Sequence, residues 1–492
     1  MNSAELSSSE PTGQLSLNAQ VGGSAHGQRG MAEPLDRWGR IGSLGANSLL
    51  VALLSPFLAL TARSMQKSLL AIIILDIPFQ VGTHFYYRES DAALGALGGL
   101  SISFTTIALA GLYLSWFIRS LTNRNTEERR SVHINRSLLL YLAIAALSMM
   151  VAQDVSLSSF EVLLLLEASL LYFYVANNVR TRQEVIFIVS MLLLACLLES
   201  LVMIVLSFTG MPLTIWGLPT HIFVDADPTS GGMRIGGTVG SPNQSAAFLS
   251  ILLAIAASVL VTSLGRAHKF LAMAVLGLGG VALVFTFSRG GWTSCAVSIT
   301  ILSLVAWRRR GLSLRVPLAA IVVLVLLYLP FHNAISTRLL GDDRGSAESR
   351  IPLMKLAFRI VEDNPVLGVG ANNFTVVMSR YLTPEFRKGF LYAVHNKYLL
   401  ILSETGIGGL LTYLAFLLGT VRTGWRCWEF DDRLLSPLAL GFMSAITGHM
   451  VQMGVDVFRG RPIQQLLWLL AGLMTAMYKM CAAAPRSLSN MA

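Results

Sequence analysis

Three short segments of this chain carry side chains of the kind that bind or transfer charged groups. The first is His395–Tyr398, which closes the longest polar stretch between two apolar runs. An imidazole titrates near neutral pH, so His395 could take a proton from an attacking hydroxyl group. A single loop histidine can also serve a purely structural purpose. We take His395 as the candidate catalytic residue.

The other two segments each carry an arginine among glycines. Arg234 lies in the glycine-rich stretch 231–240, and Arg289 lies between an apolar run and Gly290-Gly291-Trp292. A guanidinium matches two phosphate oxygens at once, and glycine allows the backbone to approach an anion closely. The alternative is an arginine that snorkels beside an interfacial tryptophan, or a solvated loop arginine. We predict that both arginines hold an anionic, lipid-linked group.

Two further polar residues could support this site. Asn243 stands at the start of an apolar run, where it could cap a helix or form another hydrogen bond. Glu404 follows His395 by nine residues, about two and a half helical turns deeper. A carboxylate is costly in lipid, so Glu404 should face the bundle interior, orienting a ligand or, as we favour, joining helices. Four more arginines could add to the same cationic surface or be solvated loop charges: Arg350, Arg359, Arg459 and Arg461.

The composition predicts the scaffold that positions these residues. Of 492 residues, 54% are hydrophobic and 13% are charged, and the mean hydropathy is +0.62. A soluble protein would carry about 25% charged residues. Apolar runs of about 18 residues recur, and helices satisfy their own backbone groups in lipid. The chain should therefore be an all-α polytopic membrane protein.

Apolar windows predict about thirteen candidate spans, at 42–63, 69–86, 93–118, 137–153, 159–177, 185–208, 244–264, 270–287, 291–307, 314–331, 397–420, 436–455 and 463–480. The net charge of +10 lies mainly in short connections such as 119–136, as cytoplasmic loops require, and does not indicate nucleic-acid binding. Successive connections alternate between the two sides of the membrane. Three spans before residue 119 would therefore put the basic N-terminal edge outside, and two would put it inside. Since 69–86 contains Asp76 and Pro78, one early run could be interfacial, and we favour twelve spans with both termini inside.

This reading divides the chain into five parts. Residues 1–40 should form a disordered cytoplasmic tail, and 41–331 a transmembrane bundle with an external loop at 209–243. Residues 332–396 should form a large external loop that contains a helix from Ser349 to Asp363, ended by Asn364-Pro365. Helices at 397–480 and a cytoplasmic tail at 481–492 complete the chain.

The polar segments together resemble the O-antigen ligase / Wzy-type polysaccharide polymerase superfamily of bacterial surface-glycan enzymes. The resemblance rests on 234–243, 287–292, 349–370 and 395–408, in that order. It implies a multi-pass protein of the bacterial inner membrane with a large helical periplasmic loop between late spans and the active site facing the periplasm. It also implies a glycosyltransferase that uses an undecaprenyl-diphosphate-linked glycan, without cofactor or metal. Arg234 and Arg289 would hold the donor diphosphate, and His395 would activate the acceptor.

Three functions stay open at this stage. A polymerase would join lipid-linked repeat units of an exopolysaccharide or O-antigen, and a ligase would transfer the glycan to lipid A core. We favour the polymerase, for which a chain-length regulator is a further candidate partner. A flippase would need charged residues along a midplane path. The candidate arginines instead gather at one outer rim, which favours surface chemistry.

Overall fold

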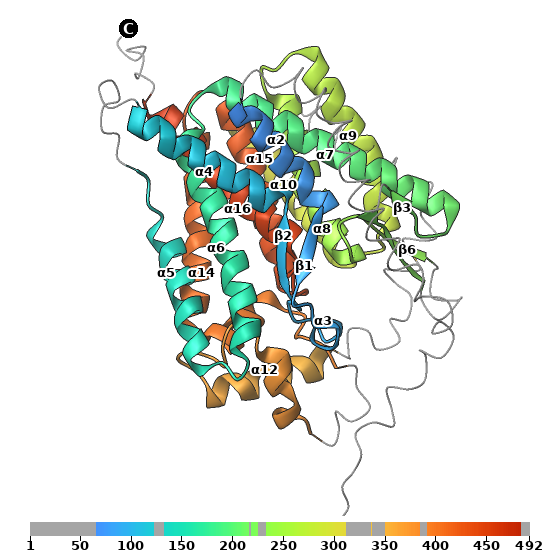
Figure 1. Ribbon diagram of the computed structural model, residues 1–492. Helices are drawn as coiled ribbons and strands as arrows, with labels where there is room; N and C mark the ends of the chain where they lie inside the picture. Colours follow the sequence, from blue (N-terminus) through green and yellow to red (C-terminus); the bar gives the residue numbers. More distant parts are fainter. Residues whose placement is uncertain are drawn as a thin grey trace, which may run out of the picture.

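The computed structural model describes residues 65–122, 132–215, 218–224, 233–310, 336, 350–383 and 391–483 (Figure 1). The predicted tail at 1–40 and the candidate spans 42–63 and 314–331 lie outside these ranges.

Helices make up most of the described chain. Their bounds are α2 Met65–Phe79, α3 Glu89–Ala93, α4 Phe104–Thr122, α5 Arg136–Ser148, α6 Val155–Asn178, α7 Arg182–Thr209, α8 Pro242–Val261, α9 Arg266–Phe285, α10 Arg289–Arg310, α12 Arg350–Asp363, α13 Phe374–Val377, α14 Lys397–Trp428, α15 Leu435–Met453 and α16 Arg461–Ala483. Two 3-10 helices, η1 Met149–Val151 and η2 Met378–Tyr381, extend α5 and α13.

Three small antiparallel sheets accompany the helices, which an all-α prediction does not include. They pair β1 (Gly82–Phe85) with β2 (Leu100–Ser103), β3 (Thr214–Ile215) with β4 (Leu218–Pro219), and β5 (His221–Val224) with β6 (Met233–Gly237). The segment 209–243, predicted as a loop, therefore contains four short strands in its described part. Hydrogen bonding within these pairs satisfies backbone groups where the chain turns around.

Eleven of the thirteen predicted windows coincide with helices, namely α2, α4 to α10 and α14 to α16. Within the described residues, seven helices are long and apolar enough to cross a membrane: α6, α7, α8, α9, α10, α14 and α16. The protein is thus a polytopic membrane protein. Two window edges were wrong, because residues 80–86 and 93–103 belong to the β1–β2 hairpin and its α3 turn rather than to spans.

Predicted cytoplasmic connections meet at one end of the bundle. Arg182 forms a salt bridge of 2.5 Å with Asp432, which joins the α6–α7 and α14–α15 connections. Ser263 N donates to Arg433 O over 3.0 Å, so the α8–α9 connection lies there too. Lys479 Nζ, near the end of α16, donates to Asn177 Oδ1 over 3.2 Å. These contacts group the basic connections as the charge pattern predicts.

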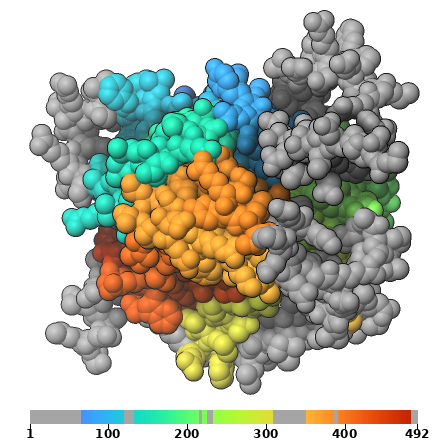
Figure 2. Space-filling view, turned by 90° about the horizontal axis from the view of Figure 1, so that it is seen from below, coloured from blue at the N-terminus to red at the C-terminus, as the bar shows by residue number. Residues whose placement is uncertain are grey.

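The remaining connections gather at the opposite end, where α12 lies beside the ends of α5 and α6 (Figure 1). Arg88 of the β1–β2 hairpin pairs with Asp154, the N-cap of α6. Ala393 N donates to Leu94 O over 2.9 Å, which attaches the hairpin to the segment before α14. In the view from below, the orange segment that begins with α12 lies at the centre of the molecular surface (Figure 2).

Small residues let the central helices approach closely. A Cβ atom on Gly448 of α15 would lie 2.0 Å from Ser298 Oγ of α10, and one on Gly441 would lie 2.3 Å from Ser258 Cβ of α8. Helices in lipid gain packing from such small residues because hydrophobic exclusion cannot hold them together. Helices α8, α10 and α15 therefore form a tight unit, and the candidate arginine segments lie at its end.

The amphipathic helix predicted within the large loop is confirmed as α12. Leu353, Leu356 and Ile360 are buried on one face, and the chain leaves the helix at Asn364-Pro365. Gly368 and Gly370 follow with φ of +67° and +98°, the left-handed region that glycine adopts without steric cost. These turns bring the loop back onto α14.

Candidate functional site

The structure places Arg234 against the start of α8 and the α9–α10 turn. Arg234 lies in β6, and its Nη2 donates to Asn243 Oδ1 over 2.9 Å, while its Nε donates to Thr286 O over 3.1 Å. The cap of α8 is Ser241, whose hydroxyl accepts from Gln244 N, so Asn243 does not act as the cap. Asn243 instead orients the guanidinium of Arg234. This pairing brings two of the predicted site residues together.

Arg289 enters the same region because the α9–α10 turn is very short. Helix α9 ends at Phe285, Phe287 takes a φ of +48°, and α10 begins at Arg289. Arg234 binds the carbonyl of Thr286 in this turn. A Cβ on Gly290 would lie 3.5 Å from Gln452 Cγ, and Gln452 Nε2 donates to Asn243 O over 3.4 Å. The segments bearing Arg234, Asn243 and Arg289 thus converge near Gln452.

His395 stands directly before helix α14, whose N-cap is Asn396. The Asn396 side chain accepts from Leu399 N over 3.0 Å, which satisfies one of the free amides at the helix start. The His395 ring packs 5.3 Å from that of Tyr392. Its Nδ1 is buried and has no hydrogen-bond partner within the described residues. The imidazole is held by packing on Tyr392 and by its interaction with the Ala393 backbone.

The α15–α16 connection links His395 to the arginine segments. Arg350 Nη1 donates to Val455 O over 3.1 Å, and a Cβ on Gly290 would lie 3.3 Å from Val455 Cγ2. Burial lowers the pKa of His395, the positive charge of Arg350 lowers it further, and the negative charge of Asp456 raises it. The net direction is downward, so His395 is neutral near pH 7 and able to accept a proton. Asp456 and Arg350 are the electrostatic neighbours of the histidine.

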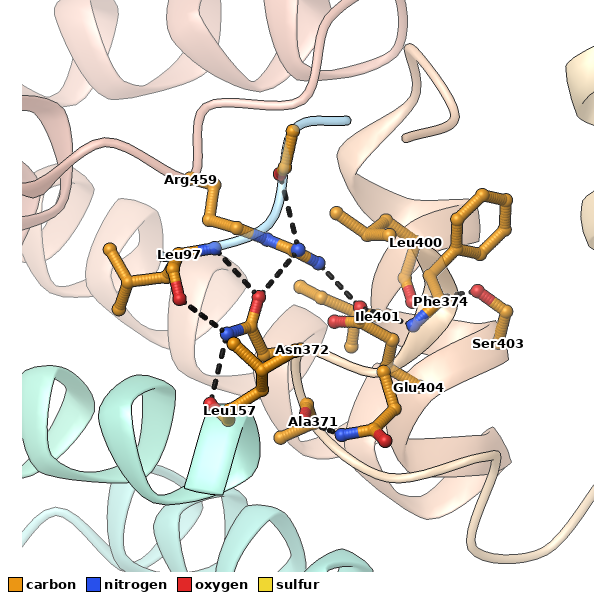
Figure 3. Close-up of polar contacts among 12 residues, drawn as sticks. Leu97, Leu157, Ala371, Asn372, Phe374, Leu400, Ile401, Ser403, Glu404 and Arg459 are labelled. Carbon is orange, nitrogen blue, oxygen red and sulfur yellow. Dashed lines mark hydrogen bonds and ion pairs between the residues drawn. The ribbon is translucent and has the colours of Figure 1, made fainter. Parts of the chain in front are cut away.

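Glu404 is buried, and its carboxylate lies beside Arg459 (Figure 3). Its Oε1 accepts from Phe374 N over 3.1 Å and forms a salt bridge of 2.5 Å with Arg459 Nη2. The favoured interpretation, a role in joining elements, agrees with these contacts. Arg459 is only 4% exposed, so its interpretation as a solvated loop charge was wrong. Glu404 thus attaches the large loop to α14.

Asn372 connects the same network to three other elements (Figure 3). Its Oδ1 accepts from Arg459 Nη1 and from Leu97 N, each over 2.8 Å, and its Nδ2 donates to Leu97 O and Leu157 O, each over 2.9 Å. The amide thus forms four hydrogen bonds while wholly buried. It fixes the loop against the β1–β2 hairpin, α6 and the α15–α16 connection.

Helix α14 is interrupted where the large loop meets it. Gly406 has a φ of +68° and a ψ of −173°, a conformation available essentially to glycine alone. The broken turn leaves carbonyl groups without partners inside the helix, and amides of the loop donate hydrogen bonds to them. Val369 N donates to Ser403 O over 3.0 Å, and Gly370 N donates to Glu404 O over 2.9 Å. In return Ile407 N donates to Pro365 O over 3.0 Å. The loop and the helix that follows His395 are therefore one structural unit.

Arg461 also proved to be buried rather than solvated. It forms a salt bridge of 2.9 Å with Glu167 of α6, and it donates to Ser101 Oγ over 3.0 Å and to Ser103 Oγ. This arginine holds the β1–β2 hairpin against α6 and α16, so it does not add to an external cationic surface. No pattern in the sequence marked these pairings, because the partners lie 294 to 360 residues apart along the chain.

A small internal cavity lies beneath the His395 motif. Lys397, Tyr413, His449, Gln464 and Trp468 are among its lining residues. It has room for about one water molecule, and is too small for a sugar. Within the described ranges no group of three His, Cys, Asp or Glu side chains could hold a metal ion. A glycan therefore does not fit in this cavity.

Comparison with known proteins identifies one part of the chain. Residues 272–414 match the family model Wzy_C, described as O-Antigen ligase. The match extends from α9 into α14 and includes Arg289 and His395, whereas Arg234 and Asn243 precede it. No curated protein matches the chain. The resemblance is confirmed over 272–414, which contains the segments 287–292, 349–370 and 395–408.

Proposed function

We propose that this multi-pass membrane protein, whose residues 272–414 match the O-antigen ligase (Wzy_C) family model, is a glycosyltransferase that polymerises undecaprenyl-diphosphate-linked repeat units. The product would be an exopolysaccharide or an O-antigen, made on the periplasmic face of the inner membrane. The family implies lipid-linked glycan substrates, and the repeat unit, its linkage and the acceptor belong to the proposal.

The observation that carries the proposal is the convergence of separate segments on one rim. Arg234 binds Asn243 and the α9–α10 turn, and that turn leads into Arg289. The residues beside it in the α15–α16 connection contact Arg350 and lie near His395. Cationic groups beside a neutral histidine suit an anionic donor and a hydroxyl acceptor.

In the proposed reaction the acceptor hydroxyl oxygen attacks the anomeric carbon of the donor glycan. The new glycosidic C–O bond forms as the bond from that carbon to the diphosphate oxygen breaks. His395 takes the hydroxyl proton, and undecaprenyl diphosphate leaves with the electron pair. Arg234 and Arg289 stabilise the charge that develops on the leaving diphosphate. The chain is proposed to do this without a metal or cofactor.

The ligase is the second candidate, and the family description favours it. The two reactions share the donor and differ in the acceptor, which is another lipid-linked glycan for the polymerase and lipid A core for the ligase. A direct test uses purified protein, an undecaprenyl-diphosphate-linked repeat unit and a chelator, with products separated by length. We expect a ladder of growing chains.

The other outcomes are equally informative. Transfer that occurs only after lipid A core is added would replace the polymerase with the ligase. No transfer to either acceptor, together with movement of the lipid-linked glycan across proteoliposome membranes, would revive the flippase. A ladder that disappears with the chelator and returns with a divalent cation would contradict metal independence.

A further inference from the structure

A buried acid on α7 holds the segment that carries Arg234. Glu199 is wholly buried, and its Oε1 accepts from Thr238 N over 2.9 Å and from Val239 N over 3.5 Å. Its Oε2 is hydrogen-bonded to Thr238 Oγ1. Thr238 directly follows strand β6, four residues after Arg234. Glu199 therefore contacts the segment that follows Arg234 and does not contact Arg234 itself.

Gly237 shows how close this contact is. It has a φ of +61°, and a Cβ there would lie 2.0 Å from Glu199 Oε1. Any larger residue would push the carboxyl group away from Thr238. The glycine preceding Thr238 is thus required by the position of Glu199 as well as by backbone conformation.

The hydrogen-bond partners of Thr238 indicate the protonation state of the acid. Besides Glu199, the Thr238 hydroxyl lies 3.1 Å from the carbonyl oxygen of Pro78, near the end of α2. That carbonyl can only accept, and carbonyls in the last turn of a helix lack partners within the helix. A hydroxyl has one proton. If Thr238 donates it to Pro78, the hydrogen bond to Glu199 Oε2 needs a proton on the carboxyl group.

Among the described residues, no cation is paired with the Glu199 side chain to balance a negative charge there. His221, on the strand paired with β6, has its pKa lowered by burial and is neutral near pH 7. An unpaired carboxylate in an apolar interior is costly, and such groups take up a proton instead.

We propose that Glu199 is a positioning residue that holds the Arg234 segment in place as a neutral carboxylic acid. Protonated Oε2 donates to Thr238 Oγ1, the Thr238 hydroxyl donates to Pro78 O, and Oε1 accepts from the backbone. This network joins α7, the end of α2 and the segment after β6. Its effect on donor binding rests on the proposed function, whereas the proton and the contact do not.

Three variants separate the possibilities. Glu199→Gln keeps one acceptor and one donor in the places that the neutral acid occupies, so it should preserve the network. Glu199→Leu removes both. Ser200→Ala is the matched control, because Ser200 is equally buried on α7 and its hydroxyl donates to Cys196 O of its own helix.

Two measurements are independent of enzymatic activity. The infrared difference spectrum between wild type and Glu199→Gln should show loss of a protonated carboxylic acid C=O band. Hydrogen exchange at amides 233–240 should rise at least about tenfold in Glu199→Leu, corresponding to about 1.4 kcal/mol. It should stay near wild type in Glu199→Gln and Ser200→Ala. Loss of a carboxylate band, or equal exchange in the Leu and Gln variants, would overturn the proposal.

The last measurement is the affinity for undecaprenyl diphosphate in detergent. We expect the dissociation constant to rise about tenfold in Glu199→Leu and to stay within about twofold of wild type in Glu199→Gln. Unchanged affinity in Glu199→Leu would overturn the positioning role. If the wild-type protein itself does not bind the lipid, the proposed function fails. The infrared spectrum still decides whether Glu199 is protonated, and hydrogen exchange still decides whether it holds segment 233–240.

Discussion

At the scale of single residues, the environment of His395 defines what it can do. Its ring packs on Tyr392, and the charges of Arg350 and Asp456 both act on its pKa. Burial is the main influence and favours the neutral imidazole, which is the form that accepts a proton. The two charged neighbours act on the same ring in opposite directions, and this makes the assignment testable.

The first prediction concerns the pH dependence of glycan transfer. Because the pKa of His395 is lowered, activity should fall on the acid side only below about 6.5, the ordinary value for histidine. Arg350→Ala removes a positive charge and should move this limb to higher pH. Asp456→Asn removes a negative charge and should move it to lower pH. The rate profile of each variant checks the signs, and a shift in the same direction in both would contradict the role of His395.

The second prediction concerns Arg289. Arg289→Ala should reduce transfer on the order of 100-fold, because one donor to the developing charge is lost. Lysine should restore the rate only in part, since it cannot form the planar two-point contact. Arg422→Ala, an exposed arginine toward the other end of α14, is the control and should retain full activity. Near wild-type transfer in Arg289→Ala would remove Arg289 from the donor site.

At this scale the sequence predicted residues that stand beside glycine or a helix start, and missed those paired across long distances. The glycines around Arg234 and Arg289 and the asparagine after His395 are local signals. Asp456 lies 61 positions after His395, and nothing near it in the sequence indicates the histidine. Arg459 was interpreted as solvated because its partner Glu404 is 55 residues away. Only the tertiary structure brings such charges together.

At the scale of elements, the interruption in α14 is the central feature. Amides in segment 365–370 of the large loop donate hydrogen bonds to the carbonyl groups that the break leaves without helical partners. The loop, the kinked helix and the α15–α16 connection then share the buried network of Asn372, Glu404 and Arg459. The sequence predicted α12 and its end at Pro365. It did not predict the break, because Glu404-Thr405-Gly406 reads as ordinary helix with one tolerated glycine.

The third prediction compares two glycines of α14. In Gly406→Ala the new Cβ would lie 2.0 Å from Val366 O at a φ of +68°, so the variant should lose at least about 3 kcal/mol. Gly408→Ala meets only the flexible end of Ile144 at 3.3 Å and should be neutral or slightly stabilising. Thermal unfolding of the detergent-solubilised proteins measures both. Similar unfolding temperatures would mean that the α14 break is absent in solution.

The fourth prediction concerns Asn372. Asn372→Ala removes four hydrogen bonds and leaves Arg459 short of a buried acceptor, which should cost about 3–5 kcal/mol. Asn178→Ala is the control, because its Nδ2 donates to Tyr174 O, within its own helix. The difference in unfolding midpoint between the two variants measures the effect. Equal losses would show that the network does not hold the loop.

At the scale of the whole molecule, apolar runs and basic connections predicted the arrangement well. Length and hydropathy locate helices in lipid because each span must satisfy its own backbone groups. The grouping of connections at two ends follows from alternation, and contacts such as Arg182–Asp432 agree with it. The β1–β2 hairpin was harder, because its short strands directly adjoin α2 and α4 and a hydropathy window does not separate them from these helices. Orientation relative to the cell stays a prediction.

The fifth prediction tests that orientation. Tyr86 of the hairpin is 82% exposed at the end that carries α12, and Asp431 is exposed at the other end. In intact cells with a permeable outer membrane, Tyr86→Cys should react with a membrane-impermeant maleimide. Asp431→Cys should react only after the inner membrane is disrupted, with the unsubstituted protein as the control for native cysteines. The reverse pattern would place the rim in the cytoplasm.

The pairing of Glu404 with Arg459 has a consequence for biogenesis. The ribosome makes segment 365–370 before α14. The amides that bond to the carbonyls at the helix break are therefore already present when α14 enters the membrane. Arg459 is made 55 residues after Glu404. The acid must therefore wait for its counter-charge until α15 has been inserted, and an unpaired charge in lipid is costly. The large loop can therefore complete its buried ion pair with the bundle only after Arg459 has been made.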